Sequence, residues 1–264
     1  MEPRAYKEMA HDEATHWWFV GRRRICAGAI ERIFAGRRLR ILEVGCGTGG
    51  NIAMLTRWGE VVAFEPDEFA REHAQREAVR LSTAVCVADG RCPDGMPDVG
   101  HFDLICMFDV LEHIAEDART LSALGERLRS GGRILLTVPA YPLLWGPHDQ
   151  FLHHQRRYTR RSLCATVRSA GLRIERLSSF NTLLLPLAVA ARMSEAVLKP
   201  RLSMGRSVPR GWINDGLLRV FSLEASILQR CSLPFGLSMM AVLRRDAPPT
   251  NYGSTTASSS SGGL

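Results

Sequence analysis

Acidic residues, glycines and histidines gather in a few short segments whose spacing could support chemistry. The first segment, residues 39–50, reads LRILEVGCGTGG, an apolar run that leads into four glycines. Glycines between a strand and a helix let the backbone approach a ligand closely, and the helix behind them leaves free N–H groups at the same place. Glu43, just before the glycines, would repel a pyrophosphate but could pair with a cationic amino acid group. This segment predicts a nucleotide-type pocket at the carboxyl end of a parallel strand.

Further acids follow the next predicted strands. Glu65 comes directly after the apolar run 61–64 and is placed to accept both hydroxyl hydrogens of a bound ribose. Asp89 follows the run 83–87 and could accept a hydrogen bond from an adenine amino group. These positions predict that the nucleoside part of the ligand lies along the ends of adjacent strands.

A histidine follows the fourth predicted strand. The segment FDVLEH begins at Phe108 and ends at His113, with Asp109 second. Histidine titrates near neutral pH, so it is the natural general base for a hydroxyl group. His113 could therefore be catalytic, and the alternative that it only holds the start of a helix stays equally open.

A polar cluster follows the fifth predicted strand. It reads HDQF from residue 148 and HHQRRY from residue 153. Three histidines and an aspartate could suggest a metal, but no paired spacing on a predicted helix supports this, so we expect no metal site. We expect the segment to shape a substrate pocket, either by binding an anionic group or by bracing the loop, through His148, Arg156, Arg157 and Tyr158.

Alternating strands and helices must position these residues. Such alternation is typical of a parallel sheet covered on both faces. Asp67 and Thr159 are predicted helix caps, and Ser130-Gly131-Gly132 is predicted to end a helix. Apolar runs predict strands at 40–44, 61–64, 83–87, 102–107, 132–138 and 172–178, and helices are predicted at 51–58, 68–78, 117–128, 159–170 and 213–229.

Composition limits the class of protein. The chain has 264 residues, 45% hydrophobic, with a net charge of +7. Because 32 of its 34 basic residues are arginines, the charge is weak evidence for a nucleic acid or membrane partner. The seven cysteines form no C-x-x-C pair, which indicates a reducing compartment. No apolar run approaches the ~18 residues that span a bilayer, and the N-terminus lacks an apolar signal region, so we expect a cytoplasmic protein.

Five motifs, in order, resemble those of class I S-adenosylmethionine-dependent methyltransferases. They are EVGCGTG, FEPD, ADG, FDLICMFDVLEH and LRSGGRILLTVP, within residues 40–180, and the DVLEH form looks like the ubiquinone/menaquinone-type branch. The resemblance implies a Rossmann-like sheet of seven strands, six parallel and one antiparallel at 237–243, and S-adenosyl-L-methionine as cofactor. It implies that Asp109 lines the reaction centre. It implies cofactor-binding roles for Glu43, Gly45, Cys46, Gly47, Thr48 and Gly49 at the methionine end, Glu65 and Pro66 at the ribose, and Asp89 and Gly90 at the adenine.

The segments around this domain have separate predictions. Residues 1–38 are expected to be helical, either packed on the core by their aromatic residues with a solvated basic face, or forming a lid over the cofactor pocket. The methyltransferase domain is expected at 39–246, with a helical insertion at 181–233 on the acceptor side, and a disordered tail at 247–264. An apolar stretch and a run of cations predict either a helical hairpin closing the core or a peripheral membrane contact through 183–212, with its charges at Lys199, Arg201, Arg206 and Arg210.

The predicted function is transfer of a methyl group to a small or lipid-linked acceptor, at oxygen. One alternative is a nicotinamide-dependent Rossmann oxidoreductase, because the glycine spacing also satisfies G-x-G-x-x-G, a weak pattern alone. Another is a nucleic-acid methyltransferase, although the N/D-P-P-Y/F motif typical of amine-methylating enzymes is not found after the fourth strand. A third is a non-catalytic binding module, which the intact set of cofactor residues disfavours.

Overall fold

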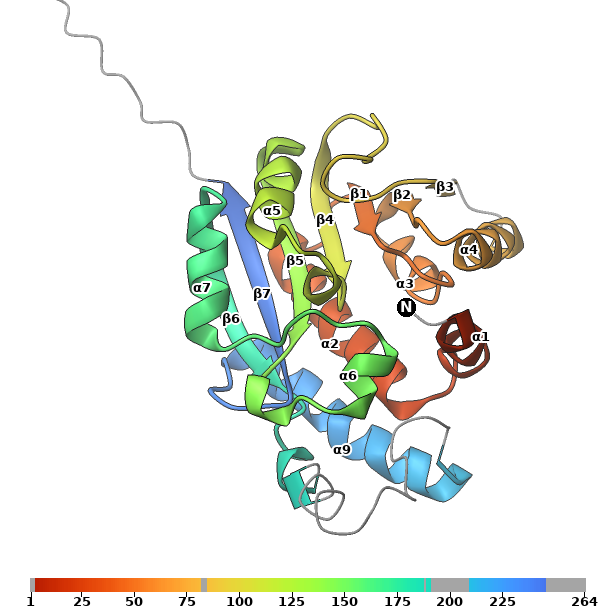
Figure 1. The fold of residues 1–264 in the computed structure, drawn as a ribbon, viewed down its shortest axis with the longest axis vertical. Coiled ribbons are helices and arrows are strands. Elements are labelled where there is room, and N and C mark those ends of the chain that lie inside the picture. The colour runs from red at the N-terminus through yellow and green to blue at the C-terminus, as the bar shows by residue number, and fades with distance from the viewer. Residues whose placement is uncertain (1–2, 82–84, 188, 191–208, 246–264) are drawn as a thin grey trace, which may run out of the picture.

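The computed structural model describes residues 3–81, 85–187, 189–190 and 209–245 (Figure 1). Strands and helices alternate along most of this length, as predicted. The strands are β1 Leu39–Val44, β2 Gly59–Phe64, β3 Val85–Ala88, β4 Phe102–Phe108, β5 Leu128–Pro139, β6 Leu172–Phe180 and β7 Ser238–Arg245. The α-helices are α1 Pro3–Asp12, α2 Trp17–Phe34, α3 Ile52–Leu55, α4 Glu68–Arg80, α5 Asp117–Glu126, α6 Pro147–Phe151, α7 Arg160–Ser169 and α9 Gly211–Arg230.

The strands form a single sheet in the order β3-β2-β1-β4-β5-β7-β6. Strand β7 runs antiparallel to both of its neighbours, β5 and β6, and every other pairing is parallel. The predicted sheet of six parallel strands and one antiparallel strand is confirmed. The order reverses beside β1, and the crevice at such a switch point is where open α/β sheets bind ligands.

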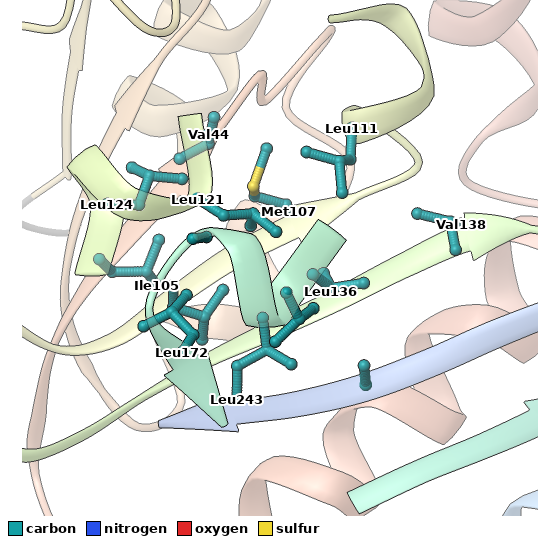
Figure 2. Packing of buried hydrophobic residues seen from close by; sticks show 14 of the residues in the cluster. Val44, Ile105, Met107, Leu111, Leu121, Leu124, Leu136, Val138, Leu172 and Leu243 are labelled. Atoms are coloured by element: carbon teal, nitrogen blue, oxygen red, sulfur yellow. The ribbon is translucent and has the colours of Figure 1, made fainter. Parts of the chain in front are cut away.

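The sheet is buried on both faces because successive strand residues point to opposite sides. In β1, Leu42 and Val44 pack on the face covered by α5 and α7, whereas Leu39 and Ile41 pack under α2 and α9. Figure 2 shows the first of these cores, where side chains of β4, β5 and β7 meet leucines of α5. This two-sided burial makes the strands rigid supports for the loops at their carboxyl ends.

Two helix caps were predicted correctly. The Asp67 side chain accepts a hydrogen bond from the Ala70 backbone N–H at the start of α4. The Thr159 hydroxyl accepts one from the Ser162 backbone N–H at the start of α7. A side-chain acceptor at this position satisfies a backbone donor that the helix itself cannot.

Two predicted boundaries were wrong. The helix expected at 51–58 is only Ile52–Leu55, because the chain turns at once into β2, which starts at Gly59. The helix expected to end at Ser130–Gly132 ends at Glu126, and those residues belong to β5. A Cβ at Gly132 would lie 2.9 Å from the Phe102 carbonyl oxygen, so this glycine permits close approach of β4 to β5 rather than ending a helix.

The N-terminal residues are helical, as expected, and their second helix packs against α9. Gly21 of α2 faces the Phe221 ring of α9 so closely that a Cβ there would overlap the ring. Within the predicted insertion, α9 contains the expected helix, whereas residues 191–208, including Lys199, Arg201 and Arg206, lie outside the described residues, as does the tail from residue 246. Among the described helices, none has the length and apolarity needed to cross a membrane.

Candidate active site

A cavity of about 1170 Å³ opens at the carboxyl ends of the central strands. Its walls come from the glycine loop after β1, the segments after β2, β4 and β5, and helices α1, α2 and α9. Ligand pockets commonly occupy ~300–1,000 Å³, so this space can hold two small ligands side by side. Residues predicted from the glycine loop and from the histidine segments therefore share one cavity.

The glycine loop contributes backbone to the cavity. Gly45 and Gly47 have φ of 64° and 55°, a region that residues with a Cβ rarely adopt. A Cβ at Gly45 would lie 2.9 Å from the Val110 side chain. Gly45, Cys46 and Gly47 line the cavity, whereas Thr48 is fully buried and Gly49 packs against Ala74 of α4.

Glu43 lies beneath this loop. It is 1% exposed, and its Oε1 accepts a hydrogen bond of 2.8 Å from the Asn51 side chain. Its Oε2 has no hydrogen-bond partner among the described residues. Burial raises the pKa of Glu43 to about 7, despite the Asn51 hydrogen bond. A cation placed over the loop would favour the charged form.

Glu65 links the loop to β2. Its Oε2 accepts from the Gly47 backbone N–H at 2.9 Å, and its Oε1 accepts from the Asp67 N–H at 3.2 Å and the Tyr6 hydroxyl at 3.3 Å. Burial raises the pKa of Glu65 above its ordinary value. Glu65 and Pro66 both line the cavity, where this carboxylate can accept hydroxyl hydrogens.

The prediction for Asp89 does not match its placement. Its side chain is 76% exposed and forms an ion pair of 3.1 Å with Arg71 of α4, because that arginine reaches over the end of β3. Asp89 is not among the residues lining the cavity, whereas Gly90 is. The wall at this end is made by residues 90–93 instead.

Arg22 of α2 reaches the segment after β4 and pairs with Asp109. Its guanidinium donates to Asp109 Oδ2 and lies 4.7 Å from the centroid of the Trp18 ring. Arg22 is only 6% exposed, so the expected solvated basic face of the N-terminal helices is wrong at this position. Asp109 has φ of 57°, an unfavourable conformation for a non-glycine residue, which the ion pair and a backbone hydrogen bond to Thr137 hold in place.

Glu112, His113 and His154 meet beside Asp109. The rings of His113 and His154 are edge to face with centroids 4.7 Å apart, and His154 Nε2 is 4.0 Å from Glu112 Oε1. Glu112 is fully buried with neither oxygen hydrogen-bonded among the described residues. Burial, followed by the charge of Asp109, raises its pKa well above the ordinary value. The three residues each offer one atom within 4.8 Å of the others, a spacing compatible with a metal ion.

Asp149 fixes the orientation of His154. Its Oδ1 lies 2.9 Å from His154 Nδ1, and it also accepts a hydrogen bond of 2.7 Å from the Arg157 guanidinium. Because a carboxylate only accepts, His154 Nδ1 carries the proton and Nε2 of the neutral ring is an acceptor. Burial and the neighbouring His154 lower the pKa of His113 to about 3, so His113 is neutral at physiological pH.

The four residues predicted to bind substrate divide into two groups. His148 and Arg157 line the cavity, although Arg157 is engaged by Asp149. Arg156 and Tyr158 do not line it: Arg156 pairs with Asp117 at 2.8 Å, and the Tyr158 hydroxyl donates to the same carboxylate at 2.9 Å. These contacts favour the bracing alternative for this pair, because both side chains contact the half-buried Asp117 at the start of α5.

Several residues that line the cavity were not predicted from the sequence, because the residues they contact are distant in sequence. Tyr6 and Glu13 reach the glycine loop from the N-terminal segment, and Arg22 reaches Asp109 across 87 residues. Glu112 lies in the DVLEH motif, but the sequence did not indicate that its side chain is fully buried. Two features of the sequence could have indicated these residues. Glu112 lies in the DVLEH segment, and Arg22 is the first basic residue after the aromatic cluster WWF.

The cavity fits S-adenosylmethionine. The backbone of Gly45–Gly47 lines the cavity, Glu65 can accept ribose hydrogens, and the unpartnered oxygen of Glu43, below the loop, suits a nearby cation. Arg22 lines the same cavity, and its positive charge, already paired with Asp109, can also attract a ligand carboxylate. These features match a ligand that carries an α-amino acid, a sulfonium and a nucleoside.

Comparisons with known proteins also indicate a methyltransferase. The family described as "Methyltransferase domain" matches residues 19–177. A ubiquinone biosynthesis O-methyltransferase of Aeromonas salmonicida is 28% identical over 161 residues, which cover 53% of this chain and 65% of that protein. The matched region thus spans less than two thirds of that relative. The chain belongs to the methyltransferase domain family.

Solved structures share the fold. An S-adenosylmethionine-dependent methyltransferase from Clostridium acetobutylicum has a TM-score of 0.54 at 12% identity, covering 92% of both chains. The [4+2]-cyclase SpnF has a TM-score of 0.57 at 16% identity, covering 88% of this chain and 83% of that one. The chain therefore shares its fold with both of these enzymes. Because the same fold also belongs to a cyclase, the reaction has to be argued from the site.

Proposed function

We propose that this protein transfers the methyl group of S-adenosylmethionine to a hydroxyl group of a small or lipid-linked acceptor. The observation that carries the proposal is a single cavity lined both by the glycine loop with Glu65 and by the cluster of Asp109, His113 and His154. The name of the Aeromonas relative, an O-methyltransferase, supports oxygen as the accepting atom.

Each part of the cofactor is assigned to the residues whose chemistry suits it. The Gly45–Gly47 backbone and Glu43 serve the methionine end, and Glu65 with Pro66 serves the ribose. Gly90 and the residues after it serve the adenine, whereas Asp89 acts through Arg71 at the surface. When bound, S-adenosylmethionine supplies an electrophilic methyl group on a sulfonium, and the protein's own task is to align the acceptor and exclude water.

A hydroxyl acceptor must also lose a proton, and the histidine pair is placed to take it. His154 Nε2 is the better acceptor, because Asp149 holds Nδ1 and would stabilise the imidazolium that forms. His113 packs against this ring, and its low pKa keeps it neutral as a hydrogen-bonding neighbour. Asp109 shapes the reaction centre through its pair with Arg22.

The acceptor is expected to be amphiphilic. The cavity continues from the histidines toward an apolar wall that includes Trp17, Leu184, Leu187, Ile213 and Leu217. These residues come from α2, α9 and the segment after β6, which is the predicted acceptor side. Leu187 is 54% exposed and Trp212, at the start of α9, is 75% exposed, which supports contact with a lipid surface or a lipid-linked substrate.

A paired screen tests this function. Release of S-adenosylhomocysteine is measured with catechols or hydroquinones that differ only in the presence of an alkyl tail. We expect turnover with the hydroxyl acceptors and a lower KM for the tailed member of each pair. Turnover with amine acceptors alone would contradict the proposal, as would equal KM values within each pair.

A further inference from the structure

One face of the N-terminal segment lies on the glycine loop. Tyr6, Met9 and Glu13 follow one another at intervals of three and four residues, so Tyr6 and Met9 of α1 and Glu13, the residue directly after α1, lie on the same side. The Tyr6 hydroxyl is 3.3 Å from Glu65 Oε1, and Met9 Sδ lies 3.3 Å from the position of a Cβ at Gly47. The Glu13 carboxylate fills the space that a Cβ at Gly50 would need. Helix α1 and Glu13 therefore cover the loop directly.

The Glu13 carboxylate is buried, and the charges near it only partly offset the cost of that burial. Glu13 is 9% exposed, lines the cavity and forms no ion pair with any described residue. Arg23 Nη2 donates to the Glu13 backbone carbonyl oxygen at 2.6 Å. Burial raises the pKa of Glu13 above its ordinary value, although Thr48 and the charges of Arg23 and Arg22 lower it. A buried carboxylate without a direct ion pair is costly, so a cationic ligand group in contact with it would stabilise it.

Arg22, which is paired with Asp109, lines the same cavity and brings a positive charge near Glu13. An α-amino acid carries an ammonium and a carboxylate two bonds apart, and a wall that offers both signs suits it. We propose that Glu13 binds the α-ammonium group of the methyl donor, so that the N-terminal helix recognises the amino acid end of the cofactor. This inference rests on the proposed function and adds a residue outside the glycine loop.

Glu43 does not replace Glu13 in this role. It does not line the cavity, and Asn51 occupies its Oε1. Glu43 therefore acts from below the loop through its charge, whereas Glu13 is in position for direct contact. Tyr6 ties the same helix to Glu65, so the amino acid end and the ribose end of the donor both meet one helix face.

Calorimetry with two ligands separates direct contact from a general effect on the helix. S-adenosylhomocysteine carries the amino acid end, and 5′-methylthioadenosine keeps the nucleoside and sulfur but lacks it. Glu13→Gln should weaken S-adenosylhomocysteine about 10- to 100-fold and change 5′-methylthioadenosine less than about twofold. Tyr6→Phe, the comparison variant, should affect both ligands equally.

The outcomes are distinct. An equal loss for both ligands in Glu13→Gln, or no loss for either, overturns the role of Glu13. If Glu13→Gln does not fold, Glu13→Asp is measured instead and should show the same selective loss, smaller in size; equal effects on the two ligands would again overturn the inference. Failure of the unmodified protein to bind either ligand would instead overturn the proposed function.

Discussion

Replacing Arg22 by Met should destabilise the protein strongly, because it leaves Asp109 without its cation. The guanidinium is 6% exposed, donates to Asp109 and to the Phe108 carbonyl oxygen at 3.5 Å, and lies over the Trp18 ring. Removing one partner of a buried ion pair costs ~3–5 kcal/mol. The Asp109 side chain is 17% exposed and can be partly rehydrated from the cavity, so we expect a cost below that range, about 2–3 kcal/mol.

The matched control is Arg24→Met on the same helix. Arg24 is exposed and donates a single hydrogen bond to Ser222, so its loss should cost less than ~1 kcal/mol. For a domain of this size, ~1 kcal/mol shifts Tm by about 2 °C, so Arg22→Met should melt about 4–6 °C lower and Arg24→Met within about 2 °C of the original protein. Calorimetric melting of both variants tests this. Equal Tm values for the two variants would refute the argument that the Arg22–Asp109 pair stabilises the site.

Three further predictions concern catalysis, pH and membranes. His154→Ala should lower turnover by ~10²–10⁴ and His113→Ala by less, with S-adenosylhomocysteine affinity unchanged in both; the reverse order would make His113 the base. Although burial raises the pKa of Asp149, hydrogen bonds from His154 and Arg157 hold it well below its usual range. The ionised Asp149 carboxylate therefore stabilises the folded protein above its unfolded pKa of ~3.9, and this stabilisation is lost as the pH falls further. The unfolding free energy should accordingly decline less steeply below pH 4 in Asp149→Asn than in the original protein. Each cation near an anionic membrane surface contributes ~1 kcal/mol of binding free energy, so the protein should sediment with anionic but not with neutral vesicles at low salt. This binding should vanish when Gln replaces Lys199, Arg201, Arg206 and Arg210. Equal binding to both vesicle types would contradict membrane contact.

The sheet and its main loops could be predicted because their signals are local. An apolar run followed by glycines defines β1 and the loop after it, and the side-chain oxygens of Asp67 and Thr159 define two helix starts. Such signals depend on the conformations that nearby residues can adopt. They do not say where a helix ends when the next strand follows immediately, which is why α5 was predicted to extend to residue 128.

Charge partners between distant segments could not be predicted in the same way. Asp89 was expected to face adenine, but Arg71 draws it to the surface. Arg156 and Tyr158 were expected either to bind an anionic group or to brace the loop, and both contact Asp117. Each of these residues had two chemically reasonable partners, and only the three-dimensional arrangement decides between them.

The most direct test of the account is the affinity of S-adenosylhomocysteine for the protein and for Glu65→Ala. Glu65 is 4% exposed, lines the cavity and accepts hydrogen bonds at both carboxylate oxygens, and we propose that it also binds the ribose. Loss of two charge-assisted hydrogen bonds should reduce the binding free energy by ~2–4 kcal/mol. Titration calorimetry should therefore show binding to the original protein and a drop of ~30- to 1,000-fold in a folded Glu65→Ala variant. Equal affinity in the two proteins would contradict the placement of the cofactor in this cavity.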